Sequence, residues 1–237
     1  MKLPRGQKAE IPNSLLAALP RKAYLKLLSG LTAVDLVFGE ILYEPGVPIR
    51  DVYFPGRSLI SLLTVVEGHL ALEVGMVGRE GMVGVPLVLG ADVSPVRALV
   101  QGAGPALKMN AQRFRNELNA SPPLQRELHL YLHAMMAQIS QTAACNRFHV
   151  VEARLARWLL MTRDRVCSGE FRMTHEFLSH MLGVRRVGVT EAASALQRRK
   201  LIEYSRGSIT ILDDRGLEAA CCSCYQVVND MNETAAA

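Results

Sequence analysis

The sequence predicts an α+β fold in which a β domain comes first, a long helix follows, and a small helical domain with a β-hairpin comes last. Short apolar runs separated by glycine or proline fill residues 40–107, and apolar residues at spacings of three and four follow in 122–146. Two short amphipathic segments joined by a glycine then precede a segment of alternating apolar and polar residues. With 237 residues, 49% of them hydrophobic, the chain has the length and composition of a two-domain globular protein.

The first part of the chain is predicted to begin with helix over residues 13–37, capped by Asn13 or Ser14 and restarted at Pro20. Short Val-, Ile- and Leu-rich runs then predict strands at 41–43, 52–54, 59–66, 70–77 and 96–100. Strands this short, with turns at regular intervals, indicate a small antiparallel sandwich or barrel. We assign this domain to residues 1–120.

A long central helix is predicted in residues 121–146, opened by Pro122-Pro123. Packing against the chain's own core would explain its apolar stripe, whereas a two-stranded dimer seam is the sharper hypothesis. The residues expected to line that seam are Leu124, Leu128, Tyr131, Leu132, Met135 and Ile139. A second helix is predicted over 148–166, with Arg154, Arg157, Arg163 and Arg165 on its polar face.

The net charge of +5 is unevenly distributed along the chain. Residues 1–145 carry 14 basic and 11 acidic side chains, residues 146–212 carry 12 and 6, and residues 213–237 carry 1 and 5. The positive excess therefore falls in 146–212, the segment in which a nucleic-acid contact is expected.

Residues 172–212 have the pattern of a winged helix-turn-helix. Thr174 can cap a first helix that ends at Gly183, and a second helix is predicted from about Arg186 to Arg199. The alternating segment 201–212 predicts a hairpin with its turn at 205–207. A helical subdomain whose arginines only face solvent is the alternative. The winged domain is assigned to 147–225 and a C-terminal tail to 226–237.

The second helix of this motif is expected to enter the DNA major groove with its N-terminal turn. Arg185 and Arg186 can bond guanine edges, because a guanidinium fork matches O6 and N7. Arg198, Arg199 and Arg206 are expected to bind phosphates, which gives affinity more than sequence choice. The full set of expected DNA contacts is Thr174, Arg185, Arg186, Val187, Thr190, Glu191, Ser194, Arg198, Arg199 and Arg206.

Taken together, the N-terminal β domain, the long helix and the segment MTHEFLSHMLGVRRVGVTEAASALQRRKLIEYSRGSITIL resemble the Crp/Fnr family of bacterial transcription regulators. The resemblance covers residues 14–225 and implies an antiparallel, jelly-roll-like β-roll and a homodimer paired along the central helix. It also implies a pseudo-palindromic double-stranded DNA operator. Arg186 resembles the family's base-reading arginine, whereas Val187 and Glu191 depart from its best-known members, so a different target sequence is expected.

The family's cyclic-nucleotide cassette is degenerate in this chain. Val85 stands after Gly84 where the resemblance implies a ribose-binding glutamate, and Pro86 follows it. Arg97 directly precedes Ala98 without the Ser or Thr of the family pattern, and a one-residue slip on a strand reverses the direction of a side chain. We expect cyclic AMP not to bind tightly, predict no cofactor, and leave the effector unknown.

The cysteines and histidines predict no metal site. Cys221 and Cys224 have CxxC spacing, but no second pair or nearby histidine follows them, and Cys145 and Cys167 are isolated in the sequence. Ordinary thiols are therefore the expectation, and a metal or redox-sensing role of Cys221, Cys222 and Cys224 is the alternative. His129 and His133 are spaced as a helical pair, which we interpret as a partly exposed pair beside the dimer seam. No catalytic motif is found, so we expect no enzyme.

These features also predict the location and the partners of the protein. Neither a secretory signal nor a membrane-spanning run is found, which predicts a cytoplasmic protein with no membrane partner. RNA polymerase would be a further partner of an activator, although no local feature marks a surface for it. The alternative function is a ligand- or protein-sensing module whose winged helix serves as an interaction domain without specific DNA readout.

Overall fold

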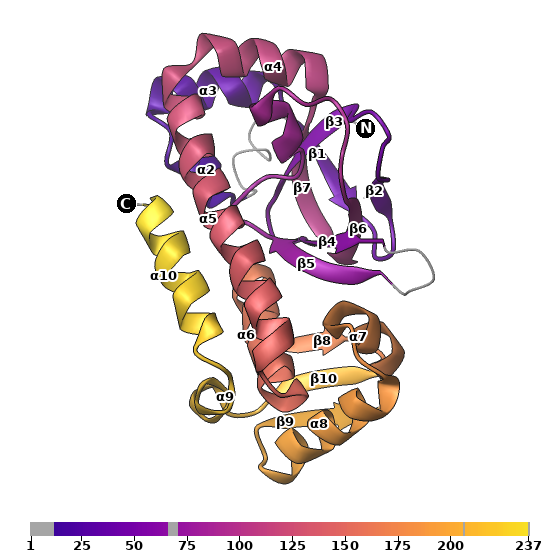
Figure 1. The fold of residues 1–237 in the computed structure, drawn as a ribbon. Coiled ribbons are helices and arrows are strands. Elements are labelled where there is room, and N and C mark those ends of the chain that lie inside the picture. The colour runs from indigo at the N-terminus through magenta and orange to yellow at the C-terminus, as the bar shows by residue number, and fades with distance from the viewer. Residues whose placement is uncertain (1–11, 66–70, 206, 237) are drawn as a thin grey trace.

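The computed structural model describes residues 12–65, 71–205 and 207–236 and confirms the α+β fold (Figure 1). The N-terminal half forms a β-roll, and the C-terminal half forms a smaller domain at the opposite end. The helix α5 (Pro122–Phe148) runs along the molecule from one to the other. Among the described helices, none is both long and apolar enough to cross a membrane.

The roll consists of two antiparallel sheets. One has the order β1-β7-β3, made by Thr32–Leu36, Gly104–Asn110 and Asp51–Pro55. The other has the order β2-β6-β4-β5, made by Ile41–Tyr43, Arg97–Gly102, Leu59–Thr64 and Leu72–Val77. Positions 66–70, at the ends of two predicted strands, lie outside the described residues.

Two parts of the roll differ from the sequence prediction. Residues 32–36 form β1 rather than the end of a helix, because they pair antiparallel with β7, and Ala33 and Leu36 are buried there. Strand β7 itself had no separate prediction. Its glycine- and proline-containing start at Gly104 reads locally as a turn, and only its long-range pairing with β1 and β3 makes it a central strand.

Short helices close the top and side of the roll. They are α2 (Ser14–Ala17), α3 (Arg21–Gly30), the 3-10 turn η1 (Val85–Leu89) and α4 (Ala111–Ala120). Asn13 caps α2, since its side-chain oxygen accepts from Leu16 N at 3.0 Å. Its amide nitrogen donates to Pro55 O and Gly81 O, both at 2.9 Å, which attaches the start of the described chain to the roll.

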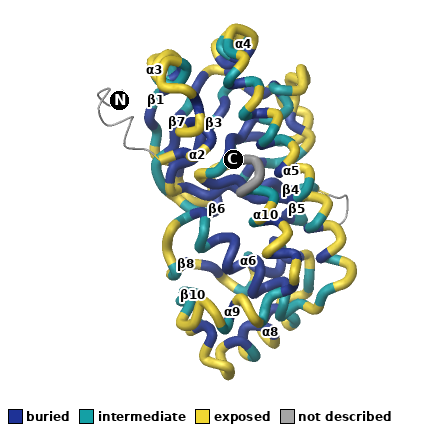
Figure 2. The backbone as a smooth tube through the Cα atoms, turned by 90° about the vertical axis from the view of Figure 1, so that its left-hand side faces the viewer, coloured by how far each residue is buried: buried dark blue, intermediate teal, exposed yellow. Residues whose placement is uncertain are grey.

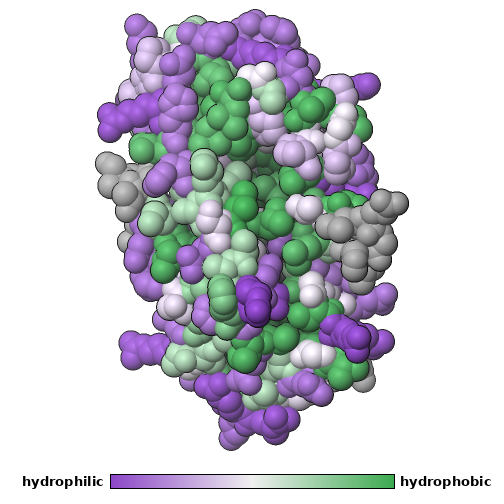
Figure 3. Space-filling view, in the orientation of Figure 1, coloured by the Kyte–Doolittle hydropathy of each residue, from purple (hydrophilic) through white to green (hydrophobic). Residues whose placement is uncertain are grey.

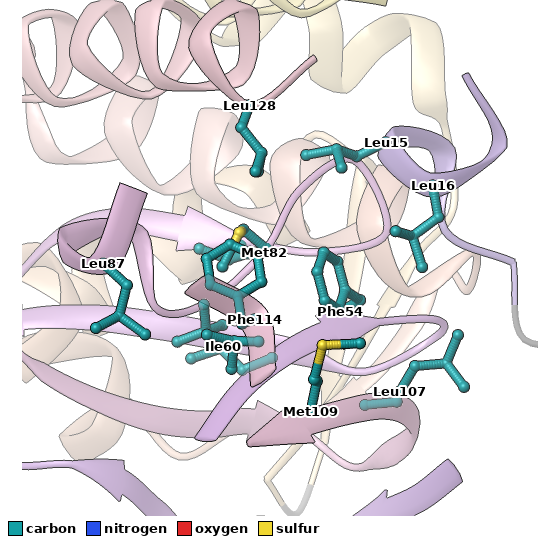
Figure 4. Packing of buried hydrophobic residues seen from close by; sticks show 14 of the residues in the cluster. Leu15, Leu16, Phe54, Ile60, Met82, Leu87, Leu107, Met109, Phe114 and Leu128 are labelled. Carbon is teal, nitrogen blue, oxygen red and sulfur yellow. The ribbon is translucent and has the colours of Figure 1, made fainter. Parts of the chain in front are cut away.

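The apolar stripe of α5 packs mainly against the chain's own roll, which corrects the composition of the predicted dimer seam. Leu124, Leu128, Tyr131 and Met135 are buried in the roll's core, and Leu128 points into it in Figure 4. The Tyr131 hydroxyl donates to Met82 O at 3.1 Å. These four side chains are covered within one chain, so a seam would have to use a neighbouring face of α5.

The smaller domain has the predicted helix-turn-helix and hairpin. Helix α6 (Val151–Val166) precedes α7 (His175–Leu182) and α8 (Arg186–Arg198). The hairpin of β9 (Ile202–Ser205) and β10 (Ser208–Ile211) gains a third strand, β8 (Glu170–Arg172), in the order β8-β10-β9. Helix α9 (Asp214–Ala220) follows, capped by Asp213.

The arginines that form the polar face of α6 are mostly buried. Arg154, Arg157 and Arg165 are each 6% exposed or less. Arg165 donates to Glu80 Oε1 at 2.7 Å across to the roll, and Arg163 pairs with Asp164 and Asp214. Three of the twelve basic side chains of residues 146–212 are therefore buried inside the molecule.

The segment predicted as a tail forms most of another helix, α10 (Cys224–Ala236), which lies beside α5 (Figure 1). Cys224, Tyr225 and Val228 are buried at spacings of one, three and four, so one side of α10 faces the protein. Because the segment is short and acidic, its sequence did not predict a helix with an apolar side.

Candidate nucleic-acid interface

The helix-turn-helix is built by a cap, a left-handed glycine and a second helix start. Thr174 Oγ1 accepts from Phe177 N at 3.1 Å and opens α7. Gly183 ends α7 with φ of +61°, a conformation that favours glycine. A Cβ there would also lie 2.5 Å from Leu72 Cδ1 of the roll. The chain then turns into α8, for which Arg185 is the N-cap residue.

Helix α8 has one buried and one exposed face. Val189, Ala192, Ala193 and Leu196 anchor it in the domain core. Helix α8 lies at the lower end of the molecule in Figure 2, and the residues opposite its buried face are exposed. Its predicted DNA contacts are Arg186, Val187, Thr190, Glu191, Ser194 and Arg198, all exposed and all on the side away from the core. The structure therefore brings six of the ten predicted contacts onto one helix face, with Arg185 at its start.

The cations of this face differ in how far they are engaged. Within the described part of the chain, Arg185, Arg186 and Arg198 form no ion pair, which leaves their guanidinium groups available to a ligand. Arg199 lies around the helix from Arg198 and donates to Glu152 Oε1 of α6 at 2.9 Å. Arg206, the predicted phosphate contact in the hairpin turn, lies outside the described residues.

His175 belongs to this interface and was missed by the sequence interpretation. Its Nδ1 lies 2.9 Å from Thr190 Oγ1, and its ring stacks on Tyr204 with the centroids 4.3 Å apart. Thr190 also donates to Arg186 O at 3.1 Å, so the imidazole acts as hydrogen-bond donor to the hydroxyl. Burial, and then the positive charge of Arg186, lower the pKa of His175. No local signal in the sequence marks this contact, because it joins residues from three elements.

A cavity of about 430 Å³ lies in the roll where the degenerate cassette runs. Gly84, Val85 and Pro86 line it, together with Met135 and Ile139 of α5. Ala98 is buried in the roll's core instead. Arg97 does not line the cavity; its Nε donates to Glu44 Oε2 at 2.9 Å on the outside of the sheet.

The cavity wall offers little to a charged ligand. Among its described lining residues, only Tyr43 and Ser94 carry polar side-chain groups. Both hydroxyls already bond the backbone, Tyr43 to Asp51 O and Ser94 to Val96 O. The volume suits a small molecule, and the lining suits an apolar one.

Comparisons with known proteins agree with this architecture. A model described as a Crp-like helix-turn-helix domain matches residues 153–220. No curated protein matches the sequence.

Solved structures match over nearly the whole chain. A crp/fnr-family transcriptional regulator from Eubacterium rectale is 16% identical, with a TM-score of 0.67 over 87% of this chain and 96% of that one. FixK2 from Bradyrhizobium japonicum is 13% identical, with a TM-score of 0.69 over 81% and 98%. TTHA1359, a CRP/FNR-family transcriptional regulator from Thermus thermophilus, is 22% identical, with a TM-score of 0.65 over 79% and 97%. The chain thus has the fold of Crp/Fnr transcriptional regulators and contains a Crp-like helix-turn-helix domain. Both findings confirm the family resemblance of its sequence.

Proposed function

We propose that this chain is a sequence-specific DNA-binding transcription regulator that acts as a homodimer. The observation that supports it best is the exposed face of α8, on which Arg186 and Arg198 are free of ion pairs within the described residues while the opposite face is buried. Base edges would be read by the N-terminal turn of α8, and phosphates would be bound towards its C-terminal end. Two copies would bind half-sites about one helical turn apart.

The dimer would use the side of α5 that the roll leaves uncovered. Leu132, Met136, Ile139 and Ala143 recur at spacings of four, three and four, and Met136 is 67% exposed. Of the six residues expected at the seam, Leu132 and Ile139 remain available there. In Figure 3, apolar side chains gather in the middle of the face that shows α5, and hydrophilic ones lie at both ends.

The oligomeric state can be tested with one charged substitution. Met136→Glu is expected to convert a dimer into a monomer in sedimentation velocity, because two glutamates would face each other in an apolar seam. Leu25→Glu, at a 53% exposed apolar position on α3, serves as the matched control and should leave the dimer intact. A dimer that survives Met136→Glu would rule out this face.

The effector is proposed not to be a cyclic nucleotide. A phosphate in the roll cavity would meet no arginine, since Arg97 is paired with Glu44 outside it. Each polar ligand group left without a partner would cost about 1–3 kcal/mol. An apolar small molecule matches the described lining better.

The function itself is tested by binding to DNA. Genomic fragments selected by the purified protein should contain a common pseudo-palindromic site, and a labelled duplex of that site should bind more tightly than its scrambled version. The competing function is a sensing module whose winged helix contacts another protein. Failure to select any common site, with no binding even at low salt, would favour that alternative.

A further inference from the structure

Four metal-ligating side chains meet where α5 ends and α10 begins. Cys145 and His149 lie one helical turn apart at the end of α5. Cys224 is the first residue of α10, and Cys222 lies two residues before it, 77 residues after Cys145. One ligand atom from each of the four residues lies within 4.8 Å of all the others.

This grouping overturns the sequence argument against a metal site. Cys145, which appears isolated in the sequence, supplies the partner that the C-terminal cysteines lacked, and His149 supplies the missing histidine. The effective pair is Cys222-x-Cys224 rather than the CxxC pair, because the Cys221 thiol donates to Glu218 O at 3.1 Å, outside the group. The packing of α10 on α5 brings the two pairs together.

The spacing of the ligand atoms fits one tetrahedral ion. Cys145 Sγ and Cys222 Sγ are 3.5 Å apart, and Cys224 Sγ and His149 Nδ1 are 3.4 Å apart. With Zn–S bonds of about 2.3 Å, two thiolates on a tetrahedral zinc lie roughly 3.8 Å apart, and a thiolate and an imidazole nitrogen slightly less. A polynuclear iron–sulfur cluster would hold its thiolates further apart than this group does.

The surroundings offer metal-bound thiolates a hydrogen-bond donor and a nearby positive charge. Cys145 and Cys224 are fully buried, and Gln141 Nε2 donates to Cys224 Sγ at 3.0 Å. The buried Arg157 contacts Thr142 Oγ1 at 3.4 Å, its Nε has no hydrogen-bond partner, and it forms no ion pair within the described residues. Three thiolates and one imidazole on Zn²⁺ carry a net charge of −1, which this arginine would balance.

We propose that Cys145, His149, Cys222 and Cys224 bind one zinc ion. The ion closes a Cys₃His site that has four protein ligands, as a structural zinc site has. It fastens α10 to the last turn of α5, directly before α6 leads into the DNA-binding domain. The C-terminal helix is then held by metal bonds in addition to the burial of Tyr225 and Val228.

The test is metal analysis of the full-length protein, purified with a thiol reductant and without chelators. We expect one zinc per chain by plasma mass spectrometry. Replacement of zinc by cobalt should give the strong visible bands of tetrahedral Co²⁺ together with thiolate-to-cobalt charge transfer. These spectra need only the wild-type protein, so they hold even where a ligand variant fails to fold.

Single variants then assign the ligands. Cys145→Ser, His149→Gln, Cys222→Ser and Cys224→Ser should each weaken zinc binding by more than the roughly 10–100-fold that loss of an outer-shell partner costs, measured by chelator competition. Cys221→Ser and Cys167→Ser are the matched controls, since both are free thiols outside the group, and should bind zinc as the wild type does. The proposal is overturned by a protein without stoichiometric zinc, by iron with acid-labile sulfide in its place, or by equal effects of Cys221→Ser and Cys222→Ser.

Discussion

We propose that the N-terminal turn of α8 reads bases and that its C-terminal end binds phosphate, and these two roles can be tested by removing one arginine from each end. Arg186 lies in the first turn of the helix and Arg198 in the last, twelve residues away. At 1.5 Å per residue this is about 18 Å, more than the roughly 12 Å width of the major groove. If the first turn of α8 is in the groove, Arg198 is carried to its edge, where phosphates lie. The two arginines should therefore behave differently when each is changed to alanine.

The expected magnitudes follow from the two kinds of contact. Arg186→Ala removes a bidentate base contact worth about 1–3 kcal/mol, which is roughly 5- to 140-fold in affinity at one base pair of each half-site. Sites that already carry the wrong base there should lose much less. Arg198→Ala removes one phosphate contact from each protomer, so the slope of log K against log salt should fall by about 0.9 per half-site for all sequences.

The measurement is a titration of duplexes at four salt concentrations, with the selected site and with each single-base variant of it. Arg199→Ala is the matched control, because its guanidinium is paired with Glu152 and should contribute a smaller salt slope than Arg198. The reasoning is refuted if Arg186→Ala weakens every duplex by the same factor, or if Arg198→Ala changes base preference while leaving the salt slope unchanged.

Three further outcomes concern protonation and ligands. Burial raises the pKa of Glu73 to about 7 from 4.5, so the folded protein binds that proton more tightly and stability should fall as pH rises between these values. Glu73→Gln should remove that loss, on the order of 3 kcal/mol, in urea unfolding followed above pH of about 7. The pKa of His175 is lowered instead, so the stability of the folded protein should fall as pH falls below about 6.5. The melting temperature of His175→Gln should therefore depend less on pH in that range than the melting temperature of the wild type. Calorimetry with cyclic AMP should give no low-micromolar binding, whereas such binding would contradict the cavity argument.

The helix-turn-helix could be predicted from the sequence because its signals are local. A capping threonine, a glycine at the turn and an apolar spacing of three and four lie within about 25 residues, and each agrees with the others. The outward face of α8 followed directly from the buried one. The same reasoning predicted most strands of the roll, where turn residues separate short apolar runs.

The features that sequence reasoning missed depend on contacts between distant residues. The proposed zinc ligands are drawn from both ends of a 77-residue interval, and Arg165 of α6 is buried against Glu80 of the roll. The stripe of α5 was recognised, but its spacing is the same whether it faces the chain's own core or a second copy. Tertiary packing decides which surface such a stripe contacts, and the spacing of residues in the sequence does not reveal it.

Strand β5 contacts both the cavity and the DNA-binding domain. Val74 lines the cavity, while the adjacent Glu73 points to the other side and accepts from Trp158 Nε1 of α6 at 2.9 Å. Leu72, one residue earlier, lies against Gly183, the residue that ends α7. A ligand that displaced β5 would therefore act on two residues that contact the DNA-binding domain, Leu72 and Glu73. Because packed interiors shift between discrete arrangements rather than deform continuously, a ligand that moved this strand would be expected to change the packing of α6 and α7 on the roll.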